Sequence, residues 1–110
     1  MNISEQQLEA IRTWAKNKAA IRSIYLFGSR VKGTARPDSD LDVAIEVQTD
    51  DEDAFQTYMA HDDRWEAELS SVTSLQVSVQ MYHPVEAPRV YSYVASSGFK
   101  AFEREPSVKA

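Results

Sequence analysis

Apolar positions near the start of the chain recur with the period of a helix. They form one stripe: Leu8, Ile11, Ala15 and Ala19. Ser4 followed by Gln7 has the pattern of a capping box, in which side chains at the first turn satisfy main-chain N–H groups. The spacing therefore predicts a helix over residues 4–19 with one buried face.

Two apolar segments of a different character follow this helix. Residues 24–27 form a short aromatic-rich run that ends at Gly28 and predicts a buried strand. Residues 29–39 contain glycine and proline and are expected to form a turn with room for a single helical turn. From residue 40 to residue 47, apolar and polar side chains alternate, which predicts a second strand. One face carries Leu41, Val43, Ile45 and Val47, and the other carries Asp40, Asp42, Ala44 and Glu46.

The second half of the chain repeats this succession of helix and strand. An acidic run at residues 50–53 suits the positively polarised first turn of a helix. The apolar stripe of that helix would comprise Phe55, Tyr58, Met59, Trp65 and Leu69. Residues 75–82 alternate as a third strand, and residues 99–103 are expected to form a short edge strand. Between them a third helix, ending at Gly98, is marked by Ala87, Val90, Tyr91 and Val94.

This order of elements predicts an α/β (α+β) fold in which helices pack on a small mixed sheet. A length of 110 residues fits one modest core, so residues 1–110 are assigned to a single domain. Residues 1–3 and 105–110 are expected to be frayed ends.

Composition narrows the class of protein. Apolar residues make up 43% and charged residues 26% of the chain, which is ordinary for a soluble globular protein. No apolar run approaches the roughly 20 residues that span a bilayer, and the first residues lack the regions of a signal peptide. With no cysteine, the cytoplasm is the expected compartment. The net charge of −5 argues against direct nucleic-acid binding, although a small anion such as a nucleotide needs only a local site.

Two carboxylates open the second predicted strand on one face. Asp40 and Asp42 would lie about 6.5–7 Å apart along the chain. Both stay ionised only where a cation lies between them or water screens them. Mg²⁺ suits such ligands, because it takes one or two carboxylates and completes its shell with water and phosphates. For an isolated Asp-x-Asp pair, the stronger explanation is a turn-capping Asp40 and a solvent-facing Asp42.

The turn before these acids changes that balance. Gly28 permits close backbone approach to a ligand, and successive N–H groups there can form an anion-binding nest. The Ser29 hydroxyl can bond to a phosphate oxygen, Arg30 offers a planar donor fork, and Lys32 offers a point charge. A phosphate cradle facing a Mg²⁺ site is the outline of a phosphoryl-transfer centre.

Six positions at fixed spacing carry a resemblance to a known superfamily, that of the DNA polymerase β-like nucleotidyltransferases. The pattern that resembles its signature is Gly28-Ser29-x₃-Gly33-x₅-Ser39-Asp40-x-Asp42. The length and the order of elements resemble, more narrowly, the minimal nucleotidyltransferases, the MNT-type antitoxin branch.

The resemblance implies a site and a reaction. The nucleotide-binding residues would be Gly28, Ser29, Arg30 and Ser39. Asp40 and Asp42 would be catalytic and would hold Mg²⁺, at a site that can take two ions. A nucleoside monophosphate, AMP from ATP, would move to an acceptor hydroxyl with release of pyrophosphate. Members of this branch are commonly encoded beside a HEPN-domain ribonuclease toxin, which they bind and can adenylylate on a tyrosine, so a hetero- or homo-oligomer is expected.

The third carboxylate that such a site needs, on the neighbouring strand, is not found. Residues 75–82 contain no acid, and Ser78 is the best candidate for its position, with Gln76 second. Three interpretations stay open. The chain is a pseudoenzyme that neutralises its partner by binding alone, a specialised transferase with two carboxylates, or an enzyme that draws its third acid from Glu46 or Glu86.

Other polar and aromatic residues add less. The run His61-Asp62-Asp63 is interpreted as a solvated helix face, and His83 lies near the expected site. The remaining large aromatics are interpreted as core or edge residues: Trp14, Trp65, Tyr91, Tyr93 and Phe99. Transfer to RNA or to a small alcohol is the weaker hypothesis, because the chain has no basic face and no second substrate domain.

Overall fold

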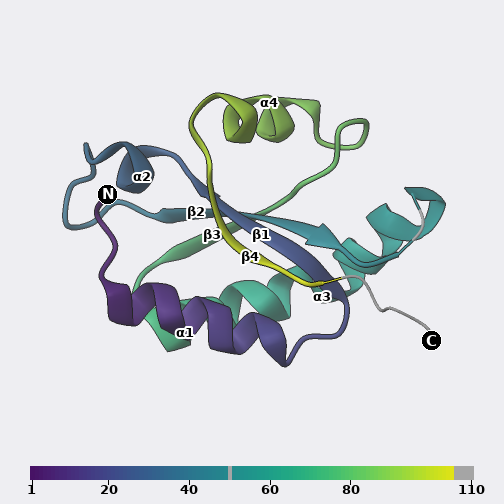
Figure 1. Ribbon diagram of the computed structural model, residues 1–110, viewed down its shortest axis with the longest axis horizontal. Coiled ribbons are helices and arrows are strands. Elements are labelled where there is room, and N and C mark those ends of the chain that lie inside the picture. Colours follow the sequence, from purple (N-terminus) through teal and green to yellow (C-terminus); the bar gives the residue numbers. More distant parts are fainter. Residues whose placement is uncertain (50, 106–110) are drawn as a thin grey trace.

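In the computed structural model, which describes residues 1–49 and 51–105, four helices alternate with four strands. Figure 1 shows the elements in chain order: α1 (Glu5–Lys16), β1 (Ile21–Phe27), α2 (Ser29–Lys32), β2 (Leu41–Val47), α3 (Asp51–Thr73), β3 (Val77–Met81), α4 (Pro88–Ser97) and β4 (Phe99–Glu103).

The strands form one mixed sheet in the order β3-β2-β1-β4. β1 pairs antiparallel with β2 and with β4, whereas β2 and β3 are parallel. A parallel pair needs a crossover connection, and the 23-residue helix α3 supplies it between β2 and β3. The predicted α/β fold with a small mixed sheet is confirmed.

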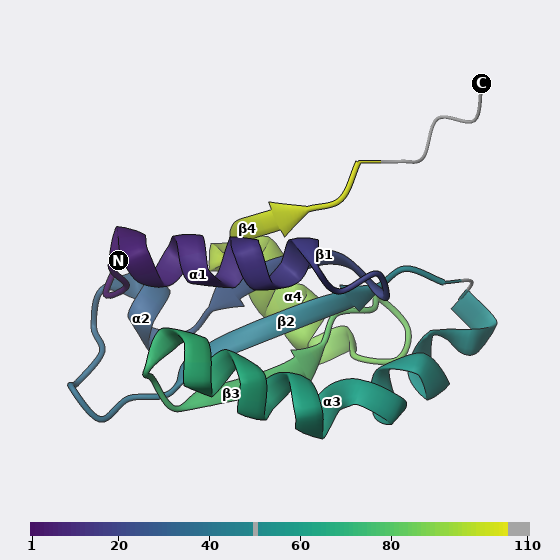
Figure 2. The same cartoon turned by 90° about the horizontal axis from the view of Figure 1, so that it is seen from below.

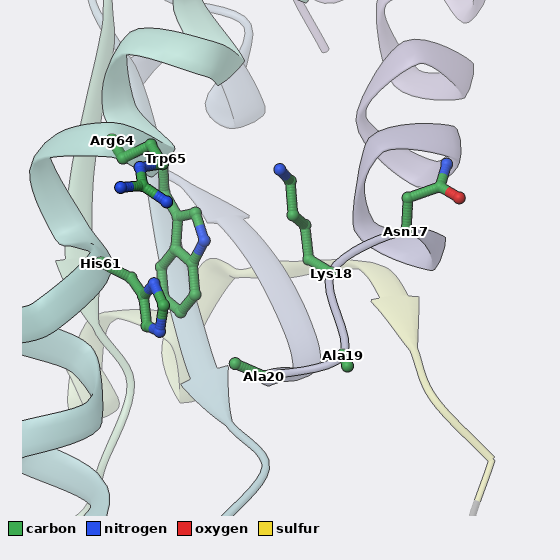
Figure 3. Close-up of a pocket in the computed structure, with 7 residues that line it drawn as sticks. All are labelled: Asn17, Lys18, Ala19, Ala20, His61, Arg64 and Trp65. Atoms are coloured by element: carbon green, nitrogen blue, oxygen red, sulfur yellow. The ribbon is translucent and has the colours of Figure 1, made fainter.

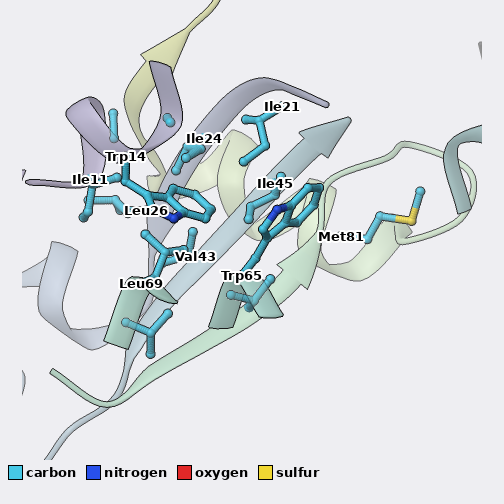
Figure 4. Close-up of a cluster of buried hydrophobic side chains, with 14 of the residues drawn as sticks. Ile11, Trp14, Ile21, Ile24, Leu26, Val43, Ile45, Trp65, Leu69 and Met81 are labelled. Atoms are coloured by element: carbon cyan, nitrogen blue, oxygen red, sulfur yellow. The ribbon is translucent and has the colours of Figure 1, made fainter. Parts of the chain in front are cut away.

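The main core lies between the sheet and the helices α1 and α3, which share one face of it (Figures 1 and 2). Trp14 of α1 and Trp65 of α3 meet edge to face, with ring centroids 6.5 Å apart. Figure 4 shows the aliphatic side chains that surround them, among them Ile21, Ile24, Leu26, Val43, Ile45 and Met81. The alternation along β2 therefore buries its apolar face here and turns its acids to the opposite face.

Helix α1 starts as predicted and ends earlier. Ser4 and Gln7 form the expected capping box, because each main-chain N–H donates to the other's side-chain oxygen at 2.9 and 3.0 Å. The helix stops at Lys16, and Asn17 is its C-cap. The short amide side chain of Asn17 bonds back to the main chain, which favours a helix end. Ala19, predicted on the buried stripe, is therefore exposed in the turn before β1.

Helix α3 buries a narrower stripe than predicted. It begins at Asp51, and residue 50 of the predicted acidic start lies outside the described residues. Three members of the predicted stripe are buried: Tyr58, Trp65 and Leu69. The assignment of Phe55 and Met59 to this stripe was wrong, since they are 48% and 53% exposed. Each follows a buried residue by one position, which turns its side chain about 100° away from the core.

The opposite face of the sheet is covered by α4 (Figure 1). A small second core forms there from Phe27, Ala44 and Val94. Beside it the ring of Tyr82 packs between those of Tyr25 and Tyr91, with centroid distances of 4.4 and 4.9 Å. The contact of Val94 with Phe27 holds α4 over the end of the sheet where β1 finishes, and the tyrosine contacts hold it further along the same face.

The chain ends differ from each other. Asn2 exchanges hydrogen bonds with Arg30, so residues 1–3, expected to be frayed, are held against α2. Of the expected frayed tail, residues 106–110 lie outside the part of the chain that the structure describes. Within that part, no helix combines the length and the apolar character needed to cross a membrane.

Candidate functional site

Asp42 is the second residue of β2 and lies on the sheet face that α4 covers. Its register partners are Phe27 of β1 and Ser78 of β3. Asp42 is half-buried, whereas Asp40, just before the strand, is exposed. Burial raises the pKa of the Asp42 carboxyl above its ordinary value, and the negative charge of Asp40 adds to the rise. A cation beside the pair would offset both effects.

The turn after β1 comes directly against this carboxylate. Gly28 has φ +82° and ψ −161°, a conformation that side-chain-bearing residues adopt only under strain. A Cβ atom at Gly28 would overlap Oδ2 of Asp42 and lie 3.1 Å from its Cγ. The glycine therefore allows the backbone to pass at contact distance from Asp42.

The short helix α2 continues from this turn. Ser29 is its half-buried first residue, and the first N–H groups of a helix lack acceptors within the helix. Lys32, the last residue of α2, lines the same cavity as Gly28 and Asp42. The turn thus places main-chain donors and one cation beside the half-buried acid.

Arg30 and Ser39, both expected at the nucleotide, are engaged elsewhere. Arg30 is 8% exposed. Its guanidinium donates to three main-chain carbonyls, those of Ser39 at 3.0 Å, Asn2 at 3.0 Å and Pro37 at 3.2 Å. The Ser39 hydroxyl accepts from the N–H of Arg36 at 2.8 Å. This placement gives both residues a part in holding the loop before β2, and their contact with phosphate stays a prediction.

The position expected for a third carboxylate holds Ser78. Because β2 and β3 are parallel and in register, Ser78 lies beside Asp42 at the spacing of neighbouring strands, about 4.8 Å. Gln76 precedes β3, is exposed, and accepts the N–H of Leu41 with its carbonyl. Of the two positions considered from the sequence, Ser78 is therefore the neighbour of Asp42. Its hydroxyl offers a neutral oxygen and no negative charge.

The two other acids considered as substitutes lie apart from this point. Glu46 accepts a hydrogen bond from the Ser23 hydroxyl at 2.6 Å, near the far end of β2. Glu86 is exposed in the turn before α4, where its N–H and that of Val85 donate to Nδ1 of His83. His83 thus orders this turn. Among the described residues, no group of three or more His, Cys, Asp or Glu side chains is arranged to hold a metal.

The donors that are present nevertheless fit a hard divalent cation. Carboxylate oxygens are the ligands that Mg²⁺ prefers, and it typically takes one or two from a protein. Asp40 and Asp42 supply them, and a bound cation would favour the ionised form of Asp42, which burial and the charge of Asp40 disfavour. Gly28 leaves the approach to this carboxylate free of a side chain.

A cavity of about 380 Å³ opens over this acid. One wall is formed by Phe27, Gly28, Lys32 and Asp42, and the other by Tyr93, Ser96 and Ser97 from the last turn of α4. Sequence reasoning missed this second wall. The signal was present, because positions i, i+3 and i+4 of a helix share one face.

A smaller cavity of about 180 Å³ lies on the side of the sheet away from Asp42, between α3 and the loop after α1 (Figure 3). Here His61, expected on a solvated face, is half-buried and stacks on Trp65 with centroids 4.9 Å apart. Lys18 and Arg64 also line it, and Lys18 pairs with Glu68 at 2.8 Å. No carboxylate lines this cavity among the described residues, so it lacks the donors of the Asp42 site.

Comparison with known proteins agrees with this geometry. Residues 9–106 match the family described as Polymerase beta, Nucleotidyltransferase. That span contains every wall of the larger cavity. No curated protein sequence matches the chain significantly.

Solved structures share the fold. A toxin–antitoxin crystallised with AMP-PNP superposes with a TM-score of 0.61 at 22% identity, covering 90% of this chain and 74% of that one. One mutant of the toxin–antitoxin MntA-HpeT gives 0.61 at 18% identity, with coverages of 90% and 74%. Another mutant gives 0.60 at 19% identity, with coverages of 93% and 76%. At these identities the likeness establishes the fold.

Proposed function

Because the chain belongs to the polymerase β nucleotidyltransferase family, we propose that it binds a Mg²⁺-nucleotide at Asp42 and transfers a nucleoside monophosphate to a hydroxyl of a partner protein. The nucleotide is ATP, the transferred group is AMP and the leaving group is pyrophosphate. The observation that carries this proposal is the position of the Asp42 carboxylate, packed against the Gly28 turn in a cavity that Lys32 also lines.

Each residue of the site has a distinct part in this proposal. Asp40 and Asp42 would hold Mg²⁺; at a two-metal site, one ion would activate the attacking hydroxyl and the other would neutralise the triphosphate. Gly28 and Ser29 present main-chain N–H groups to phosphate oxygens, and Lys32 supplies a point charge.

The proposed partner is a protein toxin. Solved structures that share this fold include toxin–antitoxin pairs, one of them crystallised with AMP-PNP. We extend that pairing to this chain and assign it the role of antitoxin. The toxin is of the HEPN class, in keeping with the minimal nucleotidyltransferases that the sequence resembles.

One observation supports a second function. Ser78 stands beside Asp42 where a third acid is expected, and it carries no negative charge. A site with two carboxylates can hold a Mg²⁺-nucleotide through its phosphates and still transfer slowly. The second candidate is therefore a pseudoenzyme that neutralises its toxin by binding alone.

Transfer of label separates the two. The chain and its co-expressed HEPN partner are incubated with Mg²⁺ and ATP labelled at the α-phosphate, and labelled protein is counted. The first function predicts a labelled partner with the wild type, none with Asp42→Asn, and full labelling with Glu46→Gln, an acid on the same strand that bonds to Ser23. A toxin that is neutralised without label supports the second function. A wild type that neither labels its partner nor binds Mg²⁺-ATP contradicts the nucleotide site itself.

A further inference from the structure

Tyr93 differs from the other aromatic residues near the site. Tyr91, two positions earlier on α4, stacks on Tyr82 and so belongs to the small second core. Tyr93 is 53% exposed, and within the described residues its ring contacts no other aromatic ring. It instead lines the cavity that contains Asp42. An aromatic ring with this exposure at a cavity wall offers a free face for a flat ligand.

The two walls of that cavity differ in charge. On the Gly28 side, Lys32 supplies a cation, and the Asp42 carboxylate of the same wall is the proposed ligand of Mg²⁺, so the positive charges that meet the phosphates lie on this side. On the other side, the last turn of α4 carries no basic side chain, and a helix C-terminus is the negative end of the helix dipole. An anionic phosphate is therefore favoured near Lys32 and disfavoured against α4. The uncharged part of a nucleotide has the opposite preference.

The volume of the cavity agrees with a nucleotide whose phosphates lie at one wall and whose uncharged part lies at the other. A volume of about 380 Å³ lies within the range of about 300–1,000 Å³ found for small-molecule sites. Tyr93 precedes Ser96 and Ser97 by about one helical turn and lies on the same face of α4. The wall therefore offers an aromatic ring next to two hydroxyl groups, which suits a base joined to a sugar.

We propose that Tyr93 is the stacking surface for the base of the bound nucleotide, and that Ser96 and Ser97 face its sugar hydroxyls. This assignment rests on the proposed function, and it fixes the direction of the nucleotide, with the triphosphate at Gly28 and Lys32 and the nucleoside at α4. Stacking discriminates weakly among bases, because every base has a π-face. Stacking on Tyr93 alone therefore does not select ATP over GTP.

Calorimetric titration with Mg²⁺-ATP and with Mg²⁺-tripolyphosphate tests this assignment. Tyr93→Ala should weaken ATP binding by about tenfold and leave tripolyphosphate binding within about twofold, because the latter ligand has no base. Tyr93→Phe keeps the ring and should bind ATP within about twofold of the wild type. Tyr91→Phe, which alters a tyrosine of the same helix outside the cavity, is the matched control.

A second variant reports on the contact directly. Tyr93→Trp places an exposed indole at the wall, while the native Trp14 and Trp65 are 8% and 2% exposed. ATP should quench the new fluorescence and tripolyphosphate should not. ATP binding by Tyr93→Ala that equals the wild type, or an equal loss of both ligands, overturns the stacking role alone. A wild type that binds neither ligand overturns the proposed function and this assignment with it.

Discussion

Gly28 and Asp42 are packed so closely that the first has no room for a side chain. A Cβ atom at Gly28 would overlap the Asp42 carboxylate, and the φ of +82° at this glycine independently disfavours any other residue. Gly28 directly follows β1 and Asp42 is the second residue of β2, and these two strands pair antiparallel. The strand pairing thus brings the turn and the acid together.

This contact predicts unequal effects at two glycines. Gly28→Ala should cost about 1–3 kcal/mol of unfolding free energy and weaken Mg²⁺-ATP binding by about tenfold or more, because the methyl group displaces Asp42. Gly33 also has a positive φ, of +79°, but a Cβ there meets only a Met1 atom at 3.9 Å. Gly33→Ala should cost about 1 kcal/mol and leave binding within about twofold. Urea unfolding and calorimetry measure both quantities, and equal binding by the two variants would mean that the close approach has no part in the site.

Asp42→Asn should stabilise the protein when metal is absent. The folded-state pKa of Asp42 is raised by burial and by Asp40, so ionising this carboxyl costs folding free energy. At pH 7 in EDTA, where that cost is fully present, the variant should melt about 2 °C higher than the wild type. The difference should vanish as the pH falls below the ordinary Asp value of 3.8, because both states of the wild type are then protonated. Added Mg²⁺ should raise the melting temperature of the wild type alone, and a lower melting temperature for Asp42→Asn in EDTA contradicts the uncompensated charge.

Arg30 and Lys32 should separate stability from binding. Arg30→Ala removes a buried guanidinium that bonds to three carbonyls, which should cost about 3 kcal/mol of unfolding free energy. Arg30→Lys should recover little of it, since an ammonium group cannot reproduce the planar fork. Lys32→Ala changes an exposed residue, so its unfolding free energy should stay within about 0.5 kcal/mol while ATP binding weakens by about tenfold. An Arg30→Ala variant of normal stability that fails to bind ATP would support the phosphate contact that the sequence pattern suggested.

The spacing of apolar residues was enough to predict the fold. It also predicted that Asp40 and Asp42 share a face, because the alternation along a strand alone decides which residues of β2 lie on the same side. The spacing of the Gly28-Ser29 motif did not predict in which direction the neighbouring side chains point. Arg30 follows Gly28-Ser29 in the sequence, yet its orientation depends on Asn2, which is 28 residues away and reaches α2 only in the folded chain. Such a long-range contact has no local signal.

For a related reason, the sequence did not predict that α4 forms one wall of the cavity. The positions of Tyr93, Ser96 and Ser97 lie on one helix face, but a helix of mixed composition has several such faces. Which of them meets Gly28 is decided by Val94, which packs on Phe27. Periodicity predicts a face, whereas tertiary packing selects its neighbour.

Ser78→Asp tests whether the missing acid limits the site. Ser78 is the register partner of Asp42, so the new carboxylate would stand beside the existing pair. Without metal, three neighbouring anions should lower the melting temperature by about 2–5 °C. With Mg²⁺ they should tighten metal binding by about tenfold and increase transfer of labelled AMP to the partner.

Gln80→Asp is the matched control for this variant. Gln80 lies on the same face of β3 but is in register with Ala44, one strand repeat further from the acidic pair. Its variant should carry the same added charge without the gain in Mg²⁺ affinity. If the two variants bind Mg²⁺ equally, Ser78 does not occupy the third ligand position. If Ser78→Asp binds Mg²⁺ more tightly and still transfers no label, the absent carboxylate is not what prevents catalysis, and neutralisation by binding alone becomes the better account of this chain.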